Sequence, residues 1–164
     1  MKRILKCISD TYITNRIIGG RFRATDANVG QAGTIDIFKL AGESKIDDVN
    51  DGPFISGSTT EPIELSRALL KFDLEQLHQL TGSVLNVSHS SFKAYLKMSD
   101  VMGGQTVPSN YTLIIYPLAQ AFDEGLGRDV IAYEDIDSCN FITSSVSSSV
   151  TSIWFQSGAN EKGY

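Results

Sequence analysis

The sequence predicts an all-β protein, a jelly-roll-like β-sandwich of about eight strands with one short helix. Three observations lead to this fold class. Apolar residues recur with a period of two, or in short β-rich runs, along most of the chain. Only one segment has helical spacing. The chain of 164 residues is long enough to bury a core without metals or disulfides. We therefore expect a single β-sandwich domain over residues 1–164.

The expected strands are separated by loops rich in Gly, Ser, Asp and Asn. In residues 90–98, the side chains of Phe92, Ala94 and Leu96 share one face, as in a half-buried strand. Residues 111–118 form a nearly continuous apolar run, which is typical of a buried central strand. The predicted strands are 3–8, 11–14, 34–40, 62–72, 90–98, 111–118, 130–133, 140–143 and 150–156.

Residues 74–80 are the one predicted helix. Asp73 is placed to cap its N-terminus, and Gln76 fits the second half of a capping box. Leucines recur at three-residue spacing, and Gly82 follows as a stop. The capping residue and the stop together indicate a helix of about two turns.

Two features concern the loops and the end of the chain. Residues 41–61 form a loop of a length that usually carries function. The apolar triplet at residues 153–155 is followed by a polar, turn-like segment. We expect from this ending that the numbered chain is the N-terminal part of a longer protein.

Charge is distributed unevenly along the chain. The net charge is −5, which argues against nucleic acid as a partner. Residues 1–23 hold six basic side chains against one acidic one, a net charge of +5, so the remainder carries −10. This segment is interpreted either as a solvated edge with charged side chains or as a basic arm that contacts an acidic partner. The candidate partner-contact residues are Lys2, Arg3, Lys6, Arg16, Arg21 and Arg23.

The sequence predicts neither a membrane partner nor a disulfide. No stretch approaches the length of apolar residues that a membrane span needs, and residues 1–9 lack the features of a signal peptide. Cys7 and Cys139 are the only cysteines and are expected to be reduced and buried. His78 and His89 have no cysteine nearby, so no zinc site is predicted.

Acidic residues late in the chain offer oxygen atoms that suit calcium. They lack the regular spacing of a dedicated calcium loop, so an acidic surface loop is the alternative. We therefore predict no cofactor, with calcium kept as an open candidate. The candidate calcium ligands are Asp123, Glu124 and Asp129, in a cluster that also contains Glu134, Asp135 and Asp137.

No catalytic constellation is present in the sequence. Asp123 and Glu124 are adjacent, so on an extended segment they face opposite ways and do not form an acid–base pair. Ser88 to Ser91 surround His89, but no Gly-x-Ser-x-Gly motif accompanies them. Aromatic residues such as Tyr12 and Tyr133 suit either a core or a sugar platform. We therefore predict a protein that is not an enzyme.

Four segments of the chain form a recognisable pattern: residues 10–13 (DTYI), 25–35 (TDANVGQAGTI), 66–74 (SRALLKFDL) and 116–125 (YPLAQAFDEG). Together they resemble the β-sandwich modules called DNRLRE domains. Phe122 stands where the family usually has Trp, and the family's Thr-Trp-Asn segment is absent. Asn28 and Gly30 suit a tight turn with left-handed backbone conformations. The resemblance implies a module that binds or builds rather than catalyses.

Four longer phrases of the chain are TDANVGQAGTIDIFKL, ELSRALLKFDL, GGQTVPSNYTL and FDEGLGRDV. They resemble virion structural proteins of tailed bacteriophages. The resemblance implies an assembly or anchoring module of a neck, tail or fibre-like protein. Such a module would assemble in the host cytoplasm, reside in the virion, form a homo-oligomer and have other virion proteins as partners. The alternative is a carbohydrate-binding module of an adhesin-like or cell-surface protein.

Overall fold

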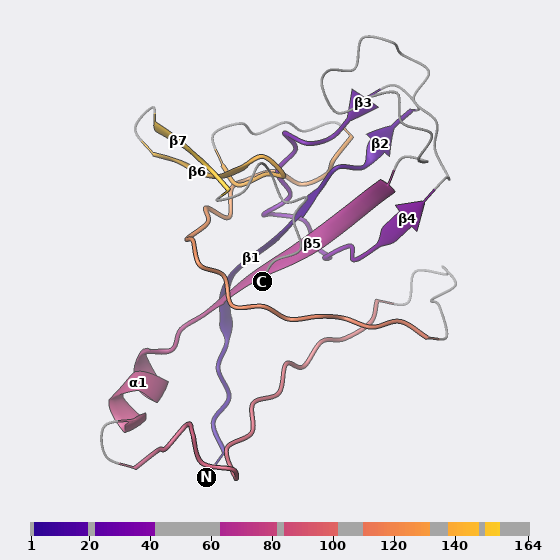
Figure 1. Ribbon diagram of the computed structural model, residues 1–164. Helices are drawn as coiled ribbons and strands as arrows, with labels where there is room; N and C mark the ends of the chain where they lie inside the picture. Colours follow the sequence, from indigo (N-terminus) through magenta and orange to yellow (C-terminus); the bar gives the residue numbers. More distant parts are fainter. Residues whose placement is uncertain are drawn as a thin grey trace. The chain divides into compact units, whose positions relative to one another are not determined.

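The computed structural model describes residues 2–19, 22–41, 63–81, 84–101, 110–131, 138–147 and 150–154. These residues are mostly β, with one short helix, and they form small antiparallel sheets without a closed barrel (Figure 1). This agrees with the predicted all-β class and its single helix. The elements are β1 (Cys7–Thr14), β2 (Ile17–Ile18), β3 (Phe22–Arg23), β4 (Lys39–Ala41), β5 (Ile63–Phe72), α1 (Glu75–Thr81), β6 (Thr143–Ser147) and β7 (Val150–Ile153).

The largest sheet has three strands in the order β1-β5-β4. β4 and β5 are antiparallel, and Lys39 pairs with Leu65. The Sγ of Cys7 donates to the carbonyl oxygen of Lys71, and the amide of Asn15 donates to that of Leu65. Because position rises along β1 as it falls along β5, these two strands also run in opposite directions. Two hairpins, β2-β3 and β6-β7, complete the described sheets.

The chain divides into two compact units. Unit 1 comprises residues 1–8 and 71–115, and unit 2 comprises residues 9–70 and 116–164. α1 belongs to unit 1, whereas β2, β3, β4, β6 and β7 belong to unit 2. β1 and β5 continue from one unit into the other.

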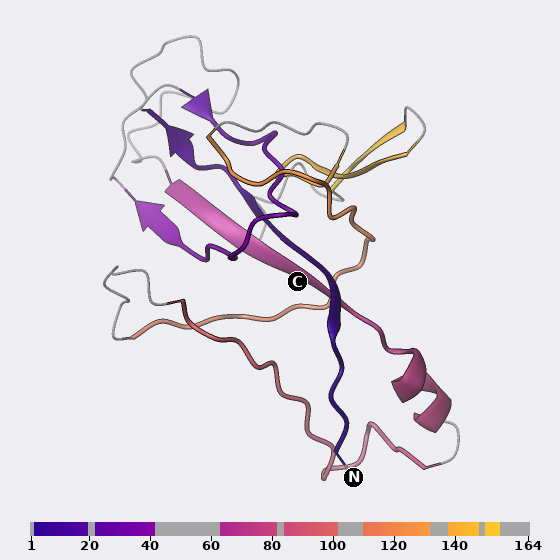
Figure 2. The ribbon, with the colours of Figure 1, turned by 180° about the vertical axis from the view of Figure 1, so that it is seen from behind.

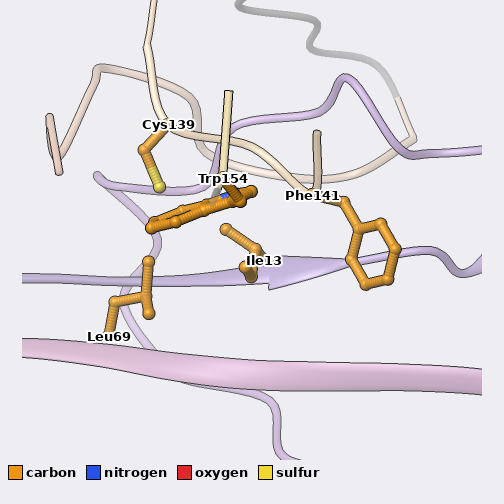
Figure 3. Close-up of a cluster of buried hydrophobic side chains, with 5 residues drawn as sticks. All are labelled: Ile13, Leu69, Cys139, Phe141 and Trp154. Carbon is orange, nitrogen blue, oxygen red and sulfur yellow. The ribbon is translucent and has the colours of Figure 1, made fainter. Parts of the chain in front are cut away.

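Unit 2 holds both hydrophobic clusters of the described chain. The Trp154 cluster joins residues from β1, from β5 and from the C-terminal third. Figure 3 shows the Trp154 ring edge-on, with Cys139 on one side and Leu69 on the other. The Trp154 cluster consists of Ile13, Leu69, Cys139, Phe141 and Trp154, with Leu65 and Phe122 packed against it. The Tyr12 cluster consists of Tyr12, Ala24, Ala27, Val29 and Val130, with Ile18, Ala32 and Ile35 packed against it.

These clusters follow from the alternation along β1. Tyr12 and Ile13 are neighbours in an extended strand, so their side chains point to opposite faces. Tyr12 enters one cluster and Ile13 enters the other. β1 is therefore buried on both faces at its C-terminal end, where the burial of residues 11–14 is continuous.

The long strand and the helix were predicted well. β5 matches the expected strand at 62–72 to within one residue. α1 matches the expected helix at 74–80 to within one residue at each end, a usual uncertainty for helix termini. The Oδ1 of Asp73 accepts a hydrogen bond from the amide of Glu75 at 3.0 Å, so this residue caps the helix as expected.

The strands expected at 90–98 and 111–118 are corrections. The described residues of both segments lie in no strand, and both are drawn as extended tubes in the two opposite views (Figures 1 and 2). Residues 111–118 are exposed throughout, not buried as a central strand would be. The apolar pattern favours an extended backbone, but a strand also needs a neighbour to accept and donate its hydrogen bonds. Among the described residues, none supplies that neighbour.

Smaller differences concern the shorter elements. β1 joins the last two residues of the strand expected at 3–8 to the strand expected at 11–14, and residues 3–6 lie in no strand. The strand expected at 34–40 is reduced to β4. Residues 140–142 form a turn rather than a strand, and Val130 and Ile131 lie in another turn. Most of the predicted loop at 41–61, residues 132 and 133, and the polar end of the chain lie outside the described residues.

Candidate partner-binding surface

Two of the four segments quoted for the resemblance, residues 25–35 and 116–125, are joined at one buried amide, that of Asn28. Its side chain is fully buried, and its Nδ2 donates to the carbonyl oxygens of Glu124 at 2.8 Å and Cys139 at 2.7 Å. Its Oδ1 accepts from the amides of Gly30 at 3.1 Å and Gly127 at 2.9 Å. All the hydrogen-bonding capacity of this amide is therefore used, as a buried polar group requires.

Two glycines allow the backbones to approach this closely. A Cβ on Gly30 would overlap the backbone carbonyl of Glu124. Gly125 has φ of 78°, a conformation that favours glycine, and a Cβ there would overlap the Asn28 side chain. Gly30 was expected to serve a left-handed turn, but only Gly19 and Gly125 have positive φ among the described glycines. The reason for glycine at position 30 is close approach.

The side chain of Glu124 connects the residues around Asn28 to β1 by hydrogen bonds. Its Oε2 accepts a hydrogen bond from the hydroxyl of Ser9 at 3.1 Å, and its Oε1 accepts from the amide of Asp10 at 3.3 Å. The carboxylate of Asp129 instead accepts from the amide of Ile131 at 2.8 Å, within its own turn. Both candidate calcium ligands therefore already bond protein groups.

The third calcium candidate, Asp123, has an exposed side chain. Its backbone amide donates to Ser144 at 3.0 Å, and its carbonyl accepts from Cys139 at 3.2 Å. Across the described residues, no group of three or more His, Cys, Asp or Glu is arranged to hold a metal ion. Calcium binding remains a prediction, and Glu134, Asp135 and Asp137 lie outside the described residues.

Residues 138–143 form a second polar turn, which contacts the Trp154 cluster. The Oδ1 of Asn140 accepts hydrogen bonds from the amides of Ile142 and Thr143, each at 2.8 Å. The indole Nε1 of Trp154 donates to the carbonyl oxygen of Asn140 at 2.9 Å. The buried indole N–H thus has the partner that its burial requires.

Burial also keeps two ionisable groups neutral in unit 2. Burial, helped by the charge of Asp36, raises the pKa of Tyr12 to about 12. Its hydroxyl donates to the Oδ2 of Asp36 at 3.5 Å. Burial, helped by the charge of Asp123, raises the pKa of the Cys139 thiol to about 12. Neither group therefore ionises near neutral pH.

The structure decides between the two interpretations of Tyr12 and corrects the expected burial of Cys7. Tyr12 is only 6% exposed, so it is a core residue and not part of a sugar platform, while Tyr133 lies outside the described residues. Cys139 is buried as expected, but Cys7 is exposed, because the first residues of β1 lie outside both hydrophobic clusters. The two cysteines are not joined by a disulfide.

The candidate basic residues fall on both units. Lys2, Arg3 and Lys6 are exposed in unit 1, where Arg3 lies beside Gln76 and Gln79 of α1. Arg16 is exposed in unit 2. Arg23 is half-buried, and its Nη1 donates to the carbonyl oxygen of Asn15 at 3.1 Å. Arg21 lies outside the described residues. The N-terminal cations of unit 1 are therefore presented to solvent.

Unit 1 presents an apolar surface that the charge pattern did not reveal. None of its described residues is buried, and α1 has no buried residue. Residues 93–101 and 111–118 form no backbone hydrogen bond with any described residue. The exposed large apolar residues of unit 1 are Ile4, Ile8, Leu74, Val84, Val87, Tyr95, Leu96, Met98, Val101, Tyr111, Leu113, Ile114 and Ile115.

Large apolar side chains left exposed are candidate contacts for a partner. The two extended segments that carry most of it can also donate and accept backbone hydrogen bonds at a sheet edge. We define the partner-binding surface as residues 93–101 and 110–115 of unit 1. The signal in the sequence was the uncharged run at 111–118, which was interpreted as core.

Comparison with protein-family models, with curated proteins and with solved structures found no significant match. In the described part of the chain, no helix has the length and apolar character needed to cross a bilayer.

Proposed function

We propose that this chain is a non-enzymatic structural component of a tailed-phage virion. In this proposal it is an assembly or anchoring module of a neck, tail or fibre-like protein. It assembles in the host cytoplasm, and its partners are other virion proteins, including further copies of itself. The finer fold belonging to this role is a jelly-roll-like β-sandwich over residues 1–164.

One observation supports an assembly role most directly. Unit 2 has a buried core with hydrogen-bonded polar groups, whereas unit 1 has no buried residue among those described and leaves many of its large apolar side chains exposed. Burying each such side chain on a partner contributes about 1.5–3 kcal/mol relative to leaving it exposed. A chain whose function is to join neighbouring subunits would carry such a surface.

The resemblance to virion proteins is the reason for proposing a phage particle as the assembly. Two of the four quoted phrases contain residues that lie together in unit 2. One phrase contains Asn28 and Gly30, and the other contains Glu124, whose backbone lies against Gly30 and accepts a hydrogen bond from Asn28. These residues have a folding role in unit 2 and are independent of the apolar surface of unit 1. The proposal therefore combines a scaffold, unit 2, with a contact surface, unit 1.

The test is to label purified phage particles with an antibody raised against residues 1–164 and to image them by electron microscopy. Label at one fixed position, at neck, tail or head, is the expected result and would locate the protein. Unlabelled particles from cells whose lysate contains the protein would contradict the virion role. Particles with a known fibre protein labelled by its own antibody serve as the control.

The alternative, a carbohydrate-binding module, is favoured by two exposed aromatic side chains. Tyr95 is 86% exposed and Tyr111 is 65% exposed. Exposed aromatic rings of this kind can stack on sugars. A glycan array probed with the chain and with its Tyr95→Ala variant tests this function. Binding that the substitution abolishes would favour the carbohydrate-binding role over the assembly role.

A further inference from the structure

The two units of the chain carry opposite net charges. Unit 1 contains six basic and three acidic side chains, a net charge of +3. Unit 2 contains eight basic and sixteen acidic side chains, a net charge of −8. The net charge of −5 for the whole chain therefore conceals a cationic part and an anionic part.

The cations of unit 1 are available for contacts with another molecule. All six are exposed, and none of their charged groups forms an ion pair or a hydrogen bond with another described residue. Two of the three acidic side chains of unit 1 act locally instead, since Asp73 caps α1 and Glu75 accepts a hydrogen bond from Gln79 at 3.1 Å. The exposed cations of unit 1 are Lys2, Arg3, Lys6, Lys71, Lys93 and Lys97.

One of these cations, Arg3, lines a pocket together with Gln76, Gln79 and Leu80 of α1. Gln79 is already bonded to Glu75, whereas the Arg3 guanidinium and the Gln76 amide have no partner among the described residues. A guanidinium binds a carboxylate through two parallel N–H bonds, and a neighbouring amide offers a further donor. The pocket therefore suits the side chain of an Asp or Glu on a partner.

Apolar side chains alternate with the cations in the same N-terminal segment. Ile4 is 82% exposed and Ile8 is 56% exposed. Exposed ion pairs contribute little affinity but select the partner, whereas burial of apolar side chains supplies affinity. The segment thus combines both parts of a specific contact. We define the cationic surface as Lys2, Arg3 and Lys6.

Unit 2 places two of its carboxylates around the hydroxyl of Tyr12. Burial and the charges of Asp36 and Asp129 raise the pKa of this phenol to about 12, so both carboxylates lie near it. The charge of Arg16 acts on the same hydroxyl in the opposite direction. Both acidic side chains are exposed. We define the acidic surface as Asp36 and Asp129.

A second copy of the chain supplies the charge that the cationic surface lacks. At physiological salt, exposed charges act over about 8 Å, so the charge of each surface matters more than the net charge of the chain. Opposite charges speed the encounter of two surfaces and fix their orientation. A contact between two different surfaces of one chain is heterologous, and its repetition builds rings or filaments.

We propose that the cationic surface of unit 1 binds the acidic surface of unit 2 in a second copy of this chain, with a carboxylate of that copy in the Arg3 pocket. The copies then associate head to tail. The inference rests on the proposed assembly role, because it names the surfaces through which neighbouring copies meet.

The first test is the mass of the full 164-residue chain, measured by analytical ultracentrifugation over a range of concentrations at low and at high salt. Species larger than the 17.9 kDa chain should form at low salt and dissociate at high salt, because salt screens exposed charges. A chain that is monomeric at every concentration in low salt would overturn the inference. Association that salt leaves unchanged would also overturn it.

The second test reverses the charge of the cationic surface. A variant with Lys2→Glu, Arg3→Glu and Lys6→Glu should associate at least tenfold more weakly than the unchanged chain. All three side chains are exposed, so the substitutions leave folding intact. Circular dichroism and the fluorescence of Trp154 check the fold of this variant and of those below.

The matched control makes the same change in net charge on exposed cations of unit 2. It carries Arg16→Glu, Lys39→Glu and Arg128→Glu. Because this control makes unit 2 more acidic, it should associate at least as strongly as the unchanged chain. If both triple variants are weakened equally, repulsion between whole chains explains the loss and the inference is wrong.

The direction of the contact is tested by mixing two variants. A variant with Asp36→Lys and Asp129→Lys keeps only its cationic surface, and the Glu triple variant of unit 1 keeps only its acidic surface. Each should be monomeric alone, and the mixture should form a 1:1 dimer and nothing larger. If the lysine variant does not fold, Asp36→Asn with Asp129→Asn replaces it, since the amides keep their acceptor oxygens. A mixture that stays monomeric, or a unit 2 variant that still associates alone, would overturn the head-to-tail contact.

The two proposals fail separately. Head-to-tail association in solution together with unlabelled particles removes the virion role and keeps the contact between copies. A chain that is monomeric in low salt but is found in particles keeps the virion role and removes that contact.

Discussion

Units 1 and 2 use similar apolar residues in opposite ways. In unit 2, Ile13 is 2% exposed and packs in the Trp154 cluster, whereas in unit 1 Ile4 is 82% exposed. The side chains are the same, so the difference comes from what surrounds them. Unit 2 brings distant segments of the sequence together around buried amides, and the described residues of unit 1 include no buried amide of this kind. Apolar composition alone therefore does not specify a core.

The largest expected difference between the units concerns isoleucine truncation. Ile13→Ala should lower the free energy of unfolding by about 2–5 kcal/mol, because it removes buried methyl groups and leaves a cavity. Ile4→Ala, its control in unit 1, should change that free energy by less than about 0.5 kcal/mol. Urea unfolding followed by the fluorescence of Trp154, the single tryptophan, measures both. Equal losses would show that Ile4 is buried in solution.

A smaller effect is expected at two glycines of unit 2. Gly30→Ala forces a methyl group against the backbone of Glu124 and should cost about 1–3 kcal/mol. Gly33→Ala is the matched control, since its Cβ meets nothing within 4 Å. The same unfolding experiment compares them. If both variants unfold at the same urea concentration, the close contact between residues 28–31 and 124–127 is not formed.

The pH dependence of stability should also come from unit 2. The pKa of Tyr12 is about 12 in the folded chain and near 10 when unfolded, so its stabilising effect is full below pH 10. That effect is lost as pH rises from 10 to 12, on the order of 2 kcal/mol. Cys139 adds a loss that begins near pH 9. Urea midpoints at pH 8 and pH 11 measure the decline.

Tyr12→Phe isolates the contribution of the phenol to this decline. The variant lacks the hydroxyl, so its stability should fall less steeply between pH 10 and pH 12 than that of the unchanged chain. An identical slope in both proteins would assign the whole decline to other groups.

The smallest expected effect is a difference between the two thiols in their rates of chemical modification. A thiol reagent under native conditions should modify Cys7 quickly, because this residue is exposed in unit 1. Cys139 is fully buried and should react only when unit 2 opens, at least about a hundredfold more slowly. Mass spectrometry of the time course distinguishes the two sites. Rapid modification of both would contradict the core described for unit 2.

Elements were predicted most accurately where the local sequence pattern and the tertiary contacts favour the same structure. The strand at 63–72 and the helix after Asp73 were predicted because each has a periodic pattern and a recognisable end. Residues 25–35 and 116–125 were named only through a resemblance, and the side chain of Asn28 joins them by donating to the carbonyl oxygen of Glu124. This contact could not be predicted, because a single sequence does not show which backbone groups an asparagine side chain will hydrogen-bond.

The partner-binding surface could be predicted only in part. The basic residues that were named from charge lie outside this surface, although three of them are exposed in unit 1. The apolar run at 111–118 was predicted as a buried strand, because periodicity reports that a segment prefers to be covered without reporting which chain covers it. Because this run is exposed in a single copy of the chain, we interpret it as a contact surface and not as core.

The amide of Asn28 has a consequence for the order of events during synthesis. Its hydrogen bonds to the backbone join residues separated by 96, 99 and 111 positions. A ribosome releases the N-terminal residue of such a pair long before its partner, and contacts at this separation form late. The N-terminal segment of unit 2 must therefore wait for residues 124–139 before its turn can close. Residues 71–115 of unit 1 are synthesised during that delay, so their exposed apolar side chains are present before unit 2 can complete its core.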